Sequence, residues 1–325
     1  MVPVFNGAET LGECLTALCN QTLGREKYEV LVVDDGSTDA MPEIIKTFPV
    51  RCVRLETNRG RIQARLAGAR EAACEDLVLC DARVLCEPDV LETALACDKR
   101  PLMFGSDWPE EYRGLYGKLL FGVYRRLWKP YFPQCGYAEQ VAITTENFDK
   151  IPKGLGLFVT DRKFFLRHQP ERSDRYISDD TLLLANMVRE SPVIRHAGLR
   201  AHYRQRTALR DVLPHLHFRG VLFQSYYLRP GHRFFAYYLV LWAVVLAAVV
   251  AAIAQPSLAW VIPTAVLAIW VLASALLAAD LKSFPAVLAA LPPVAICFAT
   301  GIVRGQLMAA WTRLTGRKES TNGTN

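Results

Sequence analysis

The sequence predicts an α/β domain with a mostly parallel sheet, followed by an α-helical transmembrane region. A wholly apolar run, Val30–Val33, precedes two carboxylates and a glycine, as expected of a strand that is buried on both faces and ends in a turn. Further along, residues 234–279 contain no charged side chain, which is long enough for two membrane crossings.

The net charge of the 325-residue chain is +6, an excess too modest to indicate nucleic-acid binding. The basic residues are unevenly distributed, because residues 195–233 contain eight arginines and a single acid, Asp211. This basic stretch directly precedes the apolar tail. It therefore predicts a face held against membrane lipid with anionic head groups, or against phosphates.

Predicted strands and helices alternate along the first hundred residues, which indicates βαβ units and a parallel sheet. We expect strands at about 1–5, 28–34, 50–55 and 76–81, and helices at about 8–22, 38–48, 61–73 and 88–97. A further strand is expected at 154–159 and a helix at 178–190. Residues 114–131 mix aromatic and basic side chains, so two interpretations stay open: an amphipathic helix on the membrane or the tail, or a helix that covers the sheet.

The apolar tail contains three segments. Residues 234–254 and 258–279 are expected to be regular spans. Residues 284–303 are interrupted by Pro292–Pro293 and are expected to be bent or re-entrant; the alternative is a third crossing that breaks the positive-inside rule. Basic residues flank both ends of the tail, and the positive-inside rule then places the α/β domain in the cytoplasm. The predicted organisation is an α/β domain at 1–220, a juxtamembrane segment at 221–233, membrane or interfacial helices at 234–310 and a disordered basic tail at 311–325.

Carboxylates follow two of the predicted strands: Asp34 and Asp35 after one, Asp81 after another. Ligands of open α/β sheets bind at the carboxyl ends of the strands, so these side chains are expected at the ligand-binding rim. Carboxylates accept hydrogen bonds from ribose hydroxyls and from base N–H groups, which suits a nucleotide. The simpler alternative for Asp34–Asp35 is a plain turn.

Five motifs in order resemble family 2 glycosyltransferases: V-P-V-F-N-G at 2–7, V-V-D-D-G-S-T-D at 32–39, N-R-G at 58–60 with Ala64, Arg65 and Gly68, Asp81 at a strand end, and S-D-D-T at 178–181. The resemblance covers residues 1 to about 220. It implies the Rossmann-like GT-A fold, a nucleotide-diphosphate sugar as donor and inversion of the anomeric centre. Many bacterial members carry C-terminal membrane helices, as here. Relatives usually have several residues before V-P-V-F-N, so the first strand is expected to be clipped.

The resemblance also implies which residues bind the donor. Asp35 and Asp81 would contact the nucleoside with Asp34 at the same rim, and Pro3, Phe5 and Asn6 would lie nearby. Asn58 and Arg65 have two open interpretations, because each could be structural or could face the nucleotide.

The metal motif departs from the family pattern. The family usually has D-x-D, whose second carboxylate helps to hold Mg²⁺ or Mn²⁺ on the diphosphate, but here the motif is Asp81-Ala82-Arg83. In one interpretation Asp81 still holds the metal, because magnesium-type sites often use only one or two protein carboxylates. In the other, Arg83 pairs directly with phosphate and replaces part of the metal's charge. We expect a metal to be used.

Asp179–Asp180 matches the acidic motif of the family. A hydroxyl that attacks the donor sugar must lose a proton, so Asp180 is predicted to be the general base, supported by Asp179. The alternative is helix capping alone. An acceptor phosphate would already be ionised, and Asp180 would then orient groups or balance charge.

Basic residues after this motif are candidates for binding the diphosphate or an acceptor phosphate: His202, Arg206 and Arg219. A lipid-facing, solvated side chain is the alternative for Arg219. Processive synthases carry Q-x-x-R-W here, whereas residues 216–220 are L-H-F-R-G, which argues against a processive enzyme.

The sequence thus predicts a non-processive glycosyltransferase in the cell membrane with a lipid-linked or cell-surface glycan acceptor. One alternative is a polyprenyl-phosphate glycosyltransferase. Another is a non-catalytic membrane scaffold that retains the fold, for which the altered D-x-D is the only support.

Overall fold

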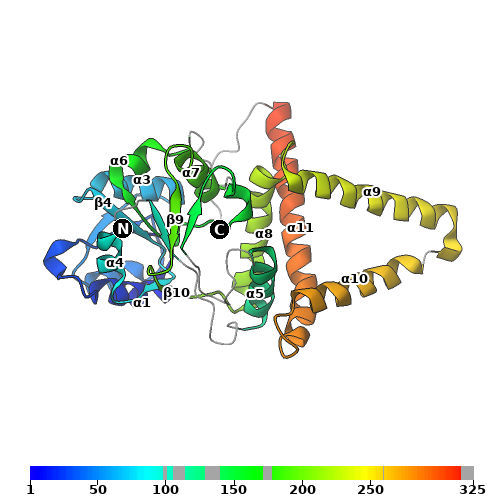
Figure 1. The fold of residues 1–325 in the computed structure, drawn as a ribbon, viewed down its shortest axis with the longest axis horizontal. Helices are drawn as coiled ribbons and strands as arrows, with labels where there is room; N and C mark the ends of the chain where they lie inside the picture. Colours follow the sequence, from blue (N-terminus) through cyan, green and yellow to red (C-terminus); the bar gives the residue numbers. More distant parts are fainter. Residues whose placement is uncertain (98–100, 105–113, 129–139, 171–177, 259, 316–325) are drawn as a thin grey trace.

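The computed structural model describes residues 1–97, 101–104, 114–128, 140–170, 178–258 and 260–315. In this part of the chain an α/β domain is followed by three helices that stand side by side, and a helical hairpin projects away from them (Figure 1). Of the C-terminal tail expected to be disordered, residues 311–315 belong instead to a helix, and those from 316 onward lie outside the described residues.

The first half of the α/β domain is a parallel sheet. Strand β2 (Leu31–Asp34) lies between β1 (Val2–Val4) and β3 (Arg51–Arg54), and both pair with it in parallel. Helices α1 (Ala8–Cys19) and α2 (Met41–Lys46) connect these strands, and α3 (Arg61–Glu71) leads to β4 (Asp76–Cys80). Val30 and Val32 belong to one apolar core, and Leu31 and Val33 to another, so β2 is buried on both faces as its sequence predicts.

Met1 joins this sheet to the second one. Its carbonyl accepts a hydrogen bond from the Cys80 N–H at 3.0 Å, and its amino group donates to the Val78 carbonyl at 2.8 Å. Strand β1 therefore lies beside β4 as well as β2. Through this contact the carboxyl ends of β1, β2 and β4 reach the same edge of the domain.

The second sheet is mixed rather than parallel, with the order β4-β8-β6-β9-β7. Strand β8 (Leu157–Asp161) runs antiparallel to β4 and to β6 (Leu102–Phe104). Strand β9 (Val193–His196) is parallel to β6 and antiparallel to β7 (Val141–Ile143). The predicted parallel arrangement thus holds for the N-terminal half of the domain.

A two-stranded antiparallel ribbon lies beside the sheets. Strand β5 (Val84–Cys86) follows Asp81 directly, and it pairs with β10 (Ala201–Tyr203). Three helices complete the domain: α4 (Val90–Ala96), α6 (Arg162–Arg167) and α7 (Asp179–Met187). The ribbon brings residues of the 81–83 motif next to a segment more than a hundred residues later, since Arg204 donates its N–H to the Arg83 carbonyl at 2.7 Å.

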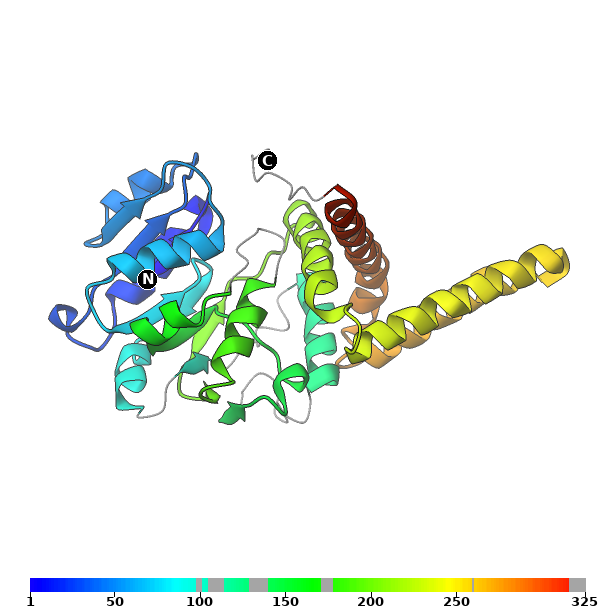
Figure 2. The same cartoon turned by 90° about the horizontal axis from the view of Figure 1, so that it is seen from above.

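Three helices form a layer between the α/β domain and the hairpin: α5 (Gly114–Trp128), α8 (Leu209–Tyr227) and α11 (Phe284–Thr315) (Figures 1 and 2). Their shared apolar core contains Tyr116, Leu119, Val212, Leu216, Val287 and Ala290. Helix α5 therefore packs against the apolar tail, which is the first of the two interpretations of its sequence. Helices α8 and α11 meet so closely that a Cβ added to Gly220 would lie 2.2 Å from the Phe298 carbonyl oxygen.

The hairpin consists of α9 (Arg233–Ala254) and α10 (Val261–Leu277) and carries exposed apolar side chains along its length. By length and composition α9 and α11 could each cross a membrane, whereas α10 is shorter, with 17 residues. The predicted regular span at 258–279 is thus the shortest of the three helices. The expected interruption at Pro292–Pro293 is absent, because α11 is one continuous helix packed against α8 and α5.

Candidate functional site

Asp34 and Asp35 lie at the carboxyl end of β2, and both are almost fully buried, with 1% and 3% of their surface exposed. Asp34 accepts a hydrogen bond from the Ser37 N–H at 2.8 Å and forms an ion pair with Arg54 at 3.3 Å. Because Asp34 is paired in this way, it shapes the turn that follows β2. Its predicted contact with the donor stays a prediction.

Asp35 ties the N-R-G turn to the strand. Its two carboxylate oxygens accept hydrogen bonds from the N–H groups of Arg59 at 2.8 Å and Gly60 at 2.9 Å. Burial, the largest effect, raises the pKa of Asp35 in spite of these two bonds. The turn after β2 approaches the backbone at Thr57 so closely that position 36 requires glycine. Its φ is +74°, and an added Cβ would lie 2.6 Å from the Thr57 carbonyl carbon.

Asn6 extends the same rim from the end of β1. It has a positive φ of 48°, its side-chain oxygen accepts the Thr38 N–H at 2.9 Å, and its own N–H donates to the Ser37 hydroxyl at 2.9 Å. Phe5 is 43% exposed beside it. The first two sequence motifs are thus bound to each other, and an exposed aromatic ring stands where a base could stack. Pro3 lies one step back in β1, and Asn58 is exposed in the N-R-G turn.

Asp81 follows β4, and its carboxylate accepts the N–H of Arg83 at 2.9 Å. The Arg83 guanidinium donates to the Arg204 carbonyl at 3.0 Å. In the described part of the chain no group of three or more His, Cys, Asp or Glu side chains is placed to hold a metal ion. A single rim carboxylate still suits an ion of the Mg²⁺ type, which takes most of its ligands from substrate phosphates and water.

Asp179 and Asp180 begin α7 and are held by two arginines of α3. Asp179 contacts Arg61, whose Nε lies 2.5 Å away, and Arg65 at 3.1 Å, whereas Asp180 pairs with Arg65 at 2.6 Å. Burial raises the pKa of Asp180, but the charges of Arg65 and Arg61, the Arg65 hydrogen bond and the charge of Arg219 together lower it to about 2. A carboxylate with so low a pKa is ionised at neutral pH and is a weak proton acceptor; the role of Asp180 as general base stays a prediction.

A cationic cluster lies between the ribbon and α8. Arg83, Arg206 and Arg219 all act electrostatically on Tyr203, as does Asp81. His215 belongs to the same cluster, because Arg219 Nε lies 3.4 Å from its Nε2. Burial, followed by the charges of Arg219, Arg206, Arg83 and Arg61, lowers the pKa of His215 to about 3. Such a concentration of guanidinium groups suits phosphate.

The structure does not bring every predicted residue to this cluster. His202 pairs with Glu87 at 2.8 Å, although the adjacent Tyr203 faces the cluster, because successive side chains of a strand point to opposite faces.

Two residues of the site, Arg61 and His215, were not predicted. Each lies four residues before a predicted arginine, Arg65 or Arg219, and this helical spacing is the signal that could have identified them.

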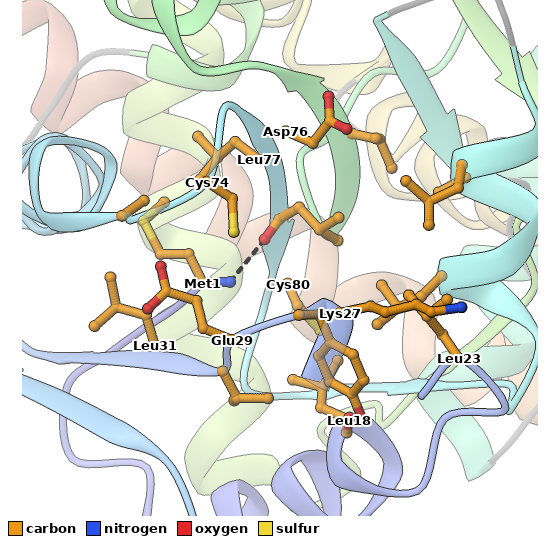
Figure 3. Close-up of a pocket in the computed structure, with 18 of the residues that line it drawn as sticks. Met1, Leu18, Leu23, Lys27, Glu29, Leu31, Cys74, Asp76, Leu77 and Cys80 are labelled. Carbon is orange, nitrogen blue, oxygen red and sulfur yellow. Dashed lines mark hydrogen bonds between the residues drawn. The ribbon is translucent and has the colours of Figure 1, made fainter. Parts of the chain in front are cut away.

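A cavity of about 370 Å³ lies at the opposite edge of the sheet, where β2 and β4 begin (Figure 3). Its lining includes Met1, Leu31, Leu77 and Cys80, and is largely apolar. None of the rim carboxylates lines it. We therefore place the functional site at the rim.

Residues 1–100 match the family model described as glycosyl transferase family 2. The chain is 37% identical over 86 residues to glycosyltransferase AglE of Haloferax volcanii, which covers 25% of this chain and 28% of that protein. It is 30% identical over 111 residues to dolichol-phosphate mannosyltransferase of Pyrococcus furiosus, covering 33% and 30%. The chain thus spans less than a third of the length of either relative.

A solved structure, mannosyltransferase PcManGT from Pyrobaculum calidifontis in complex with GDP-Man and Mn²⁺, superposes with a TM-score of 0.50. The superposition covers 97% of this chain and 86% of that one at 21% identity. This likeness shows that the α/β domain has the GT-A fold.

Proposed function

Because residues 1–100 match the glycosyl transferase family 2 model, we propose that this chain is a membrane-anchored, inverting glycosyltransferase that uses a nucleotide-diphosphate sugar. One observation carries the proposal. Asp81, after β4, lies among arginines from α3, the β10–α8 segment and the 81–83 motif, and β2 with its two carboxylates is in the same N-terminal half of the domain. A nucleotide sugar needs this pairing of acceptors for ribose with cations for diphosphate.

The donor nucleoside occupies the rim formed by Asn6, Asp35 and Asp81, with Phe5 beside the base. Asp34 and Asn58 act indirectly, since each bonds to the turn backbone in this region. Arg65 also acts indirectly, because it forms ion pairs with Asp179 and Asp180 and so holds them in place. These assignments rest on the positions of the residues at the rim.

Asp81 would hold a divalent cation together with the donor diphosphate. The metal would neutralise charge that builds up on the leaving diphosphate. Arg83 stands where a second carboxylate is usual, so the protein supplies one carboxylate and at least one guanidinium to this region. Magnesium-type ions accept such a sparse protein ligand set.

The hairpin of α9 and α10 anchors the enzyme in a bilayer. Helix α9 has 22 residues, about 33 Å long at 1.5 Å per residue, which matches a hydrocarbon core of about 30 Å. Its large apolar side chains are exposed on all sides, for example Leu246 at 65% and Ile253 at 74%. Helix α11 crosses the base of the hairpin (Figure 1), which suits a helix in the plane of the membrane surface. Arg229 precedes the hairpin and Arg233 begins it, and these two charges favour a cytoplasmic α/β domain, as in a bacterial inner-leaflet enzyme.

The acceptor is then lipid-linked. A single helix, α8, connects the rim with the hairpin, so the donor site lies close to the proposed membrane surface. Arg219 of α8 acts on Asp180, and the next residue, Gly220, contacts α11. An acceptor held in the bilayer could reach the donor without leaving the membrane surface.

The test uses the full chain in detergent or vesicles. Calorimetry with a panel of nucleotide-diphosphate sugars, with and without Mn²⁺, should show binding of at least one donor. Radiolabelled transfer from that donor into native membranes should then yield a labelled lipid. No binding to any donor, in either condition, would contradict the proposal and favour a non-catalytic scaffold.

A further inference from the structure

We infer that the attacking group of the acceptor is a phosphate oxygen on a membrane lipid, rather than a sugar or lipid hydroxyl. The inference rests on the proposed function and names the acceptor class for the same site. Three observations carry it: the pairing of the acidic motif, the unpaired arginines beside it, and the route from the cluster to α11.

The acidic motif is engaged by arginines. Arg65 is only 12% exposed in its side chain and contacts both Asp179 and Asp180, while Arg61 also contacts Asp179. A hydroxyl acceptor needs a base whose pKa lies near the working pH. The pKa of Asp180 is lowered to about 2, and that of His215 to about 3, so both are poor bases at neutral pH.

The second observation is an excess of positive charge. Asp179 and Asp180 pair with Arg61 and Arg65, whereas Arg83, Arg206 and Arg219 lie around Tyr203 together with Asp81. Within the described residues none of these three guanidinium groups forms an ion pair with a carboxylate. A site for two anions, the donor diphosphate and an acceptor phosphate, accounts for this charge.

The step balances without a proton acceptor. An oxygen of the dianionic phosphate monoester attacks the anomeric carbon, and a new C–O bond forms as the bond from that carbon to the diphosphate breaks. The nucleoside diphosphate leaves with the electron pair and carries one more negative charge. The lipid product is a phosphodiester with one negative charge fewer, and no proton is transferred. A hydroxyl acceptor, by contrast, would release a proton that a base must take.

The third observation is the position of Arg219 on α8. The following residue, Gly220, lies against Phe298 and Gly301 of α11, and an added Cβ would be 3.0 Å from the Gly301 Cα. Arg61 also lies over the ring of Phe218, at 5.7 Å from its centroid. The cationic cluster and the helix proposed to lie at the membrane surface are therefore separated by the width of one helix, where a lipid phosphate could reach both.

The experiment compares three acceptors with the full chain in vesicles: a polyprenyl monophosphate, the matching free polyprenol, and the matching polyprenyl-diphosphate monosaccharide. The monophosphate should be used at least about 100-fold faster than either hydroxyl acceptor. Its product should be acid-labile, with a phosphodiester signal in ³¹P NMR. Faster transfer to a hydroxyl, with an acid-stable product, would overturn the inference and leave the proposed function intact. Donor binding measured on the same sample separates this outcome from failure of the proposed function.

Substitution of Arg219 by Ala should raise the KM for the monophosphate about tenfold or more and leave donor affinity unchanged. Arg219→Lys should restore part of the loss, since a point charge still attracts phosphate. The matched control is Arg210→Ala on the same helix, whose side chain is 88% exposed. Weaker donor binding with an unchanged acceptor KM would place Arg219 on the donor and contradict its role here.

Asp180→Asn provides an independent measurement. If Asp180 orients the arginines, kcat with the monophosphate should fall less than about tenfold. A fall of 10²–10⁴-fold with donor affinity unchanged is the range expected for loss of a general base, and would contradict the inference.

Discussion

Arg65 links two parts of the chain that lie more than a hundred residues apart. Its guanidinium lies 3.1 Å from Asp179 and 2.6 Å from Asp180, and Arg61 adds a contact one helical turn earlier. The i, i+4 spacing on α3 therefore sets where α7 begins relative to the rim. The sequence predicted Arg65 and both aspartates but not their pairing, because no local pattern shows which long-range partner an arginine takes.

Asp81→Asn should weaken binding of the donor nucleotide about 10–100-fold, since it replaces a charged hydrogen-bond acceptor and the proposed metal ligand. The loss should be larger with Mn²⁺ present than with chelator, and calorimetry measures both. Asp89→Asn is the matched control, because Asp89 pairs with Arg200 and lies outside the rim. An equal effect of both substitutions would argue against a donor contact at Asp81.

His215 should make stability depend on pH. Its pKa is lowered to about 3 in the folded chain, whereas an unfolded histidine titrates near 6.5. Between these two pH values only the unfolded state binds the proton. The free energy of unfolding therefore keeps its full value above about pH 6.5, and below that pH it falls by up to about 1.4 kcal/mol per pH unit.

Thermal unfolding at pH 8 and pH 5.5 checks this dependence. His215→Gln should lose less stability over that interval than the unsubstituted chain. His217→Gln, on the same helix, controls for general effects of removing a histidine; its side chain contacts Thr300 instead. Identical pH dependence in all three proteins would show that His215 is not held neutral.

At the scale of elements, the strands of the first 80 residues could be predicted, and most of the later ones could not. β2 was identified because Val30–Val33 are four consecutive apolar residues before a turn signal. α3 was identified from the N-R-G turn and the small packing residues after it, and α7 from Ser178 and the acids that suit a helix start. Strands β5, β7 and β10 have only three residues each, too few to show a period. They were missed, and with them the ribbon that places Arg83 beside Arg204.

In helix α11 a break was predicted that the structure does not have. Pro292 and Pro293 predicted an interruption because proline removes a backbone donor and usually kinks a helix. The helix continues through both residues because α8 and α5 pack against it over this region. Tertiary packing therefore outweighs the local preference.

The α8–α11 crossing should be sensitive to the smallest added side chain. In Gly220→Ala the new Cβ would meet the Phe298 carbonyl oxygen, a backbone atom that cannot rotate away. The cost should be roughly 1–3 kcal/mol, seen as a lower melting temperature in detergent. Gly154→Ala is the control, because no atom lies within 4 Å of its added Cβ. Equal melting temperatures would mean that the two helices can separate without cost.

For the whole molecule, the hairpin should determine membrane attachment. Leu246→Arg places a charge in the middle of α9, where insertion should become less favourable by about 2.5–3.5 kcal/mol. The carbonate-resistant membrane fraction should fall accordingly. Leu281→Arg, at a 92% exposed position in the turn between α10 and α11, should have little effect. If Leu246→Arg stays fully membrane-bound, α11 rather than the hairpin is the anchor.

The general plan of the molecule was predictable because it depends on composition: a mixed domain, then an uncharged tail. How the tail meets the domain was not, since the pairing of Gly220 with Gly301 and of Gly122 with the Leu277 carbonyl depends on residues far apart in the chain. Glycines within helices are the only local hint of such close contacts.

The shared core of α5, α8 and α11 has a practical consequence for producing the α/β domain by itself. A chain shortened at residue 220 would cut α8 between Arg219 and Val221 and would remove Val287 and Ala290, which cover Val212 and Leu216. The shortened chain would expose an apolar surface on α8 beside Arg219, and it would be prone to aggregate. A water-soluble version is better sought by excising the projecting hairpin and rejoining α8 to α11, so that the helical layer stays whole.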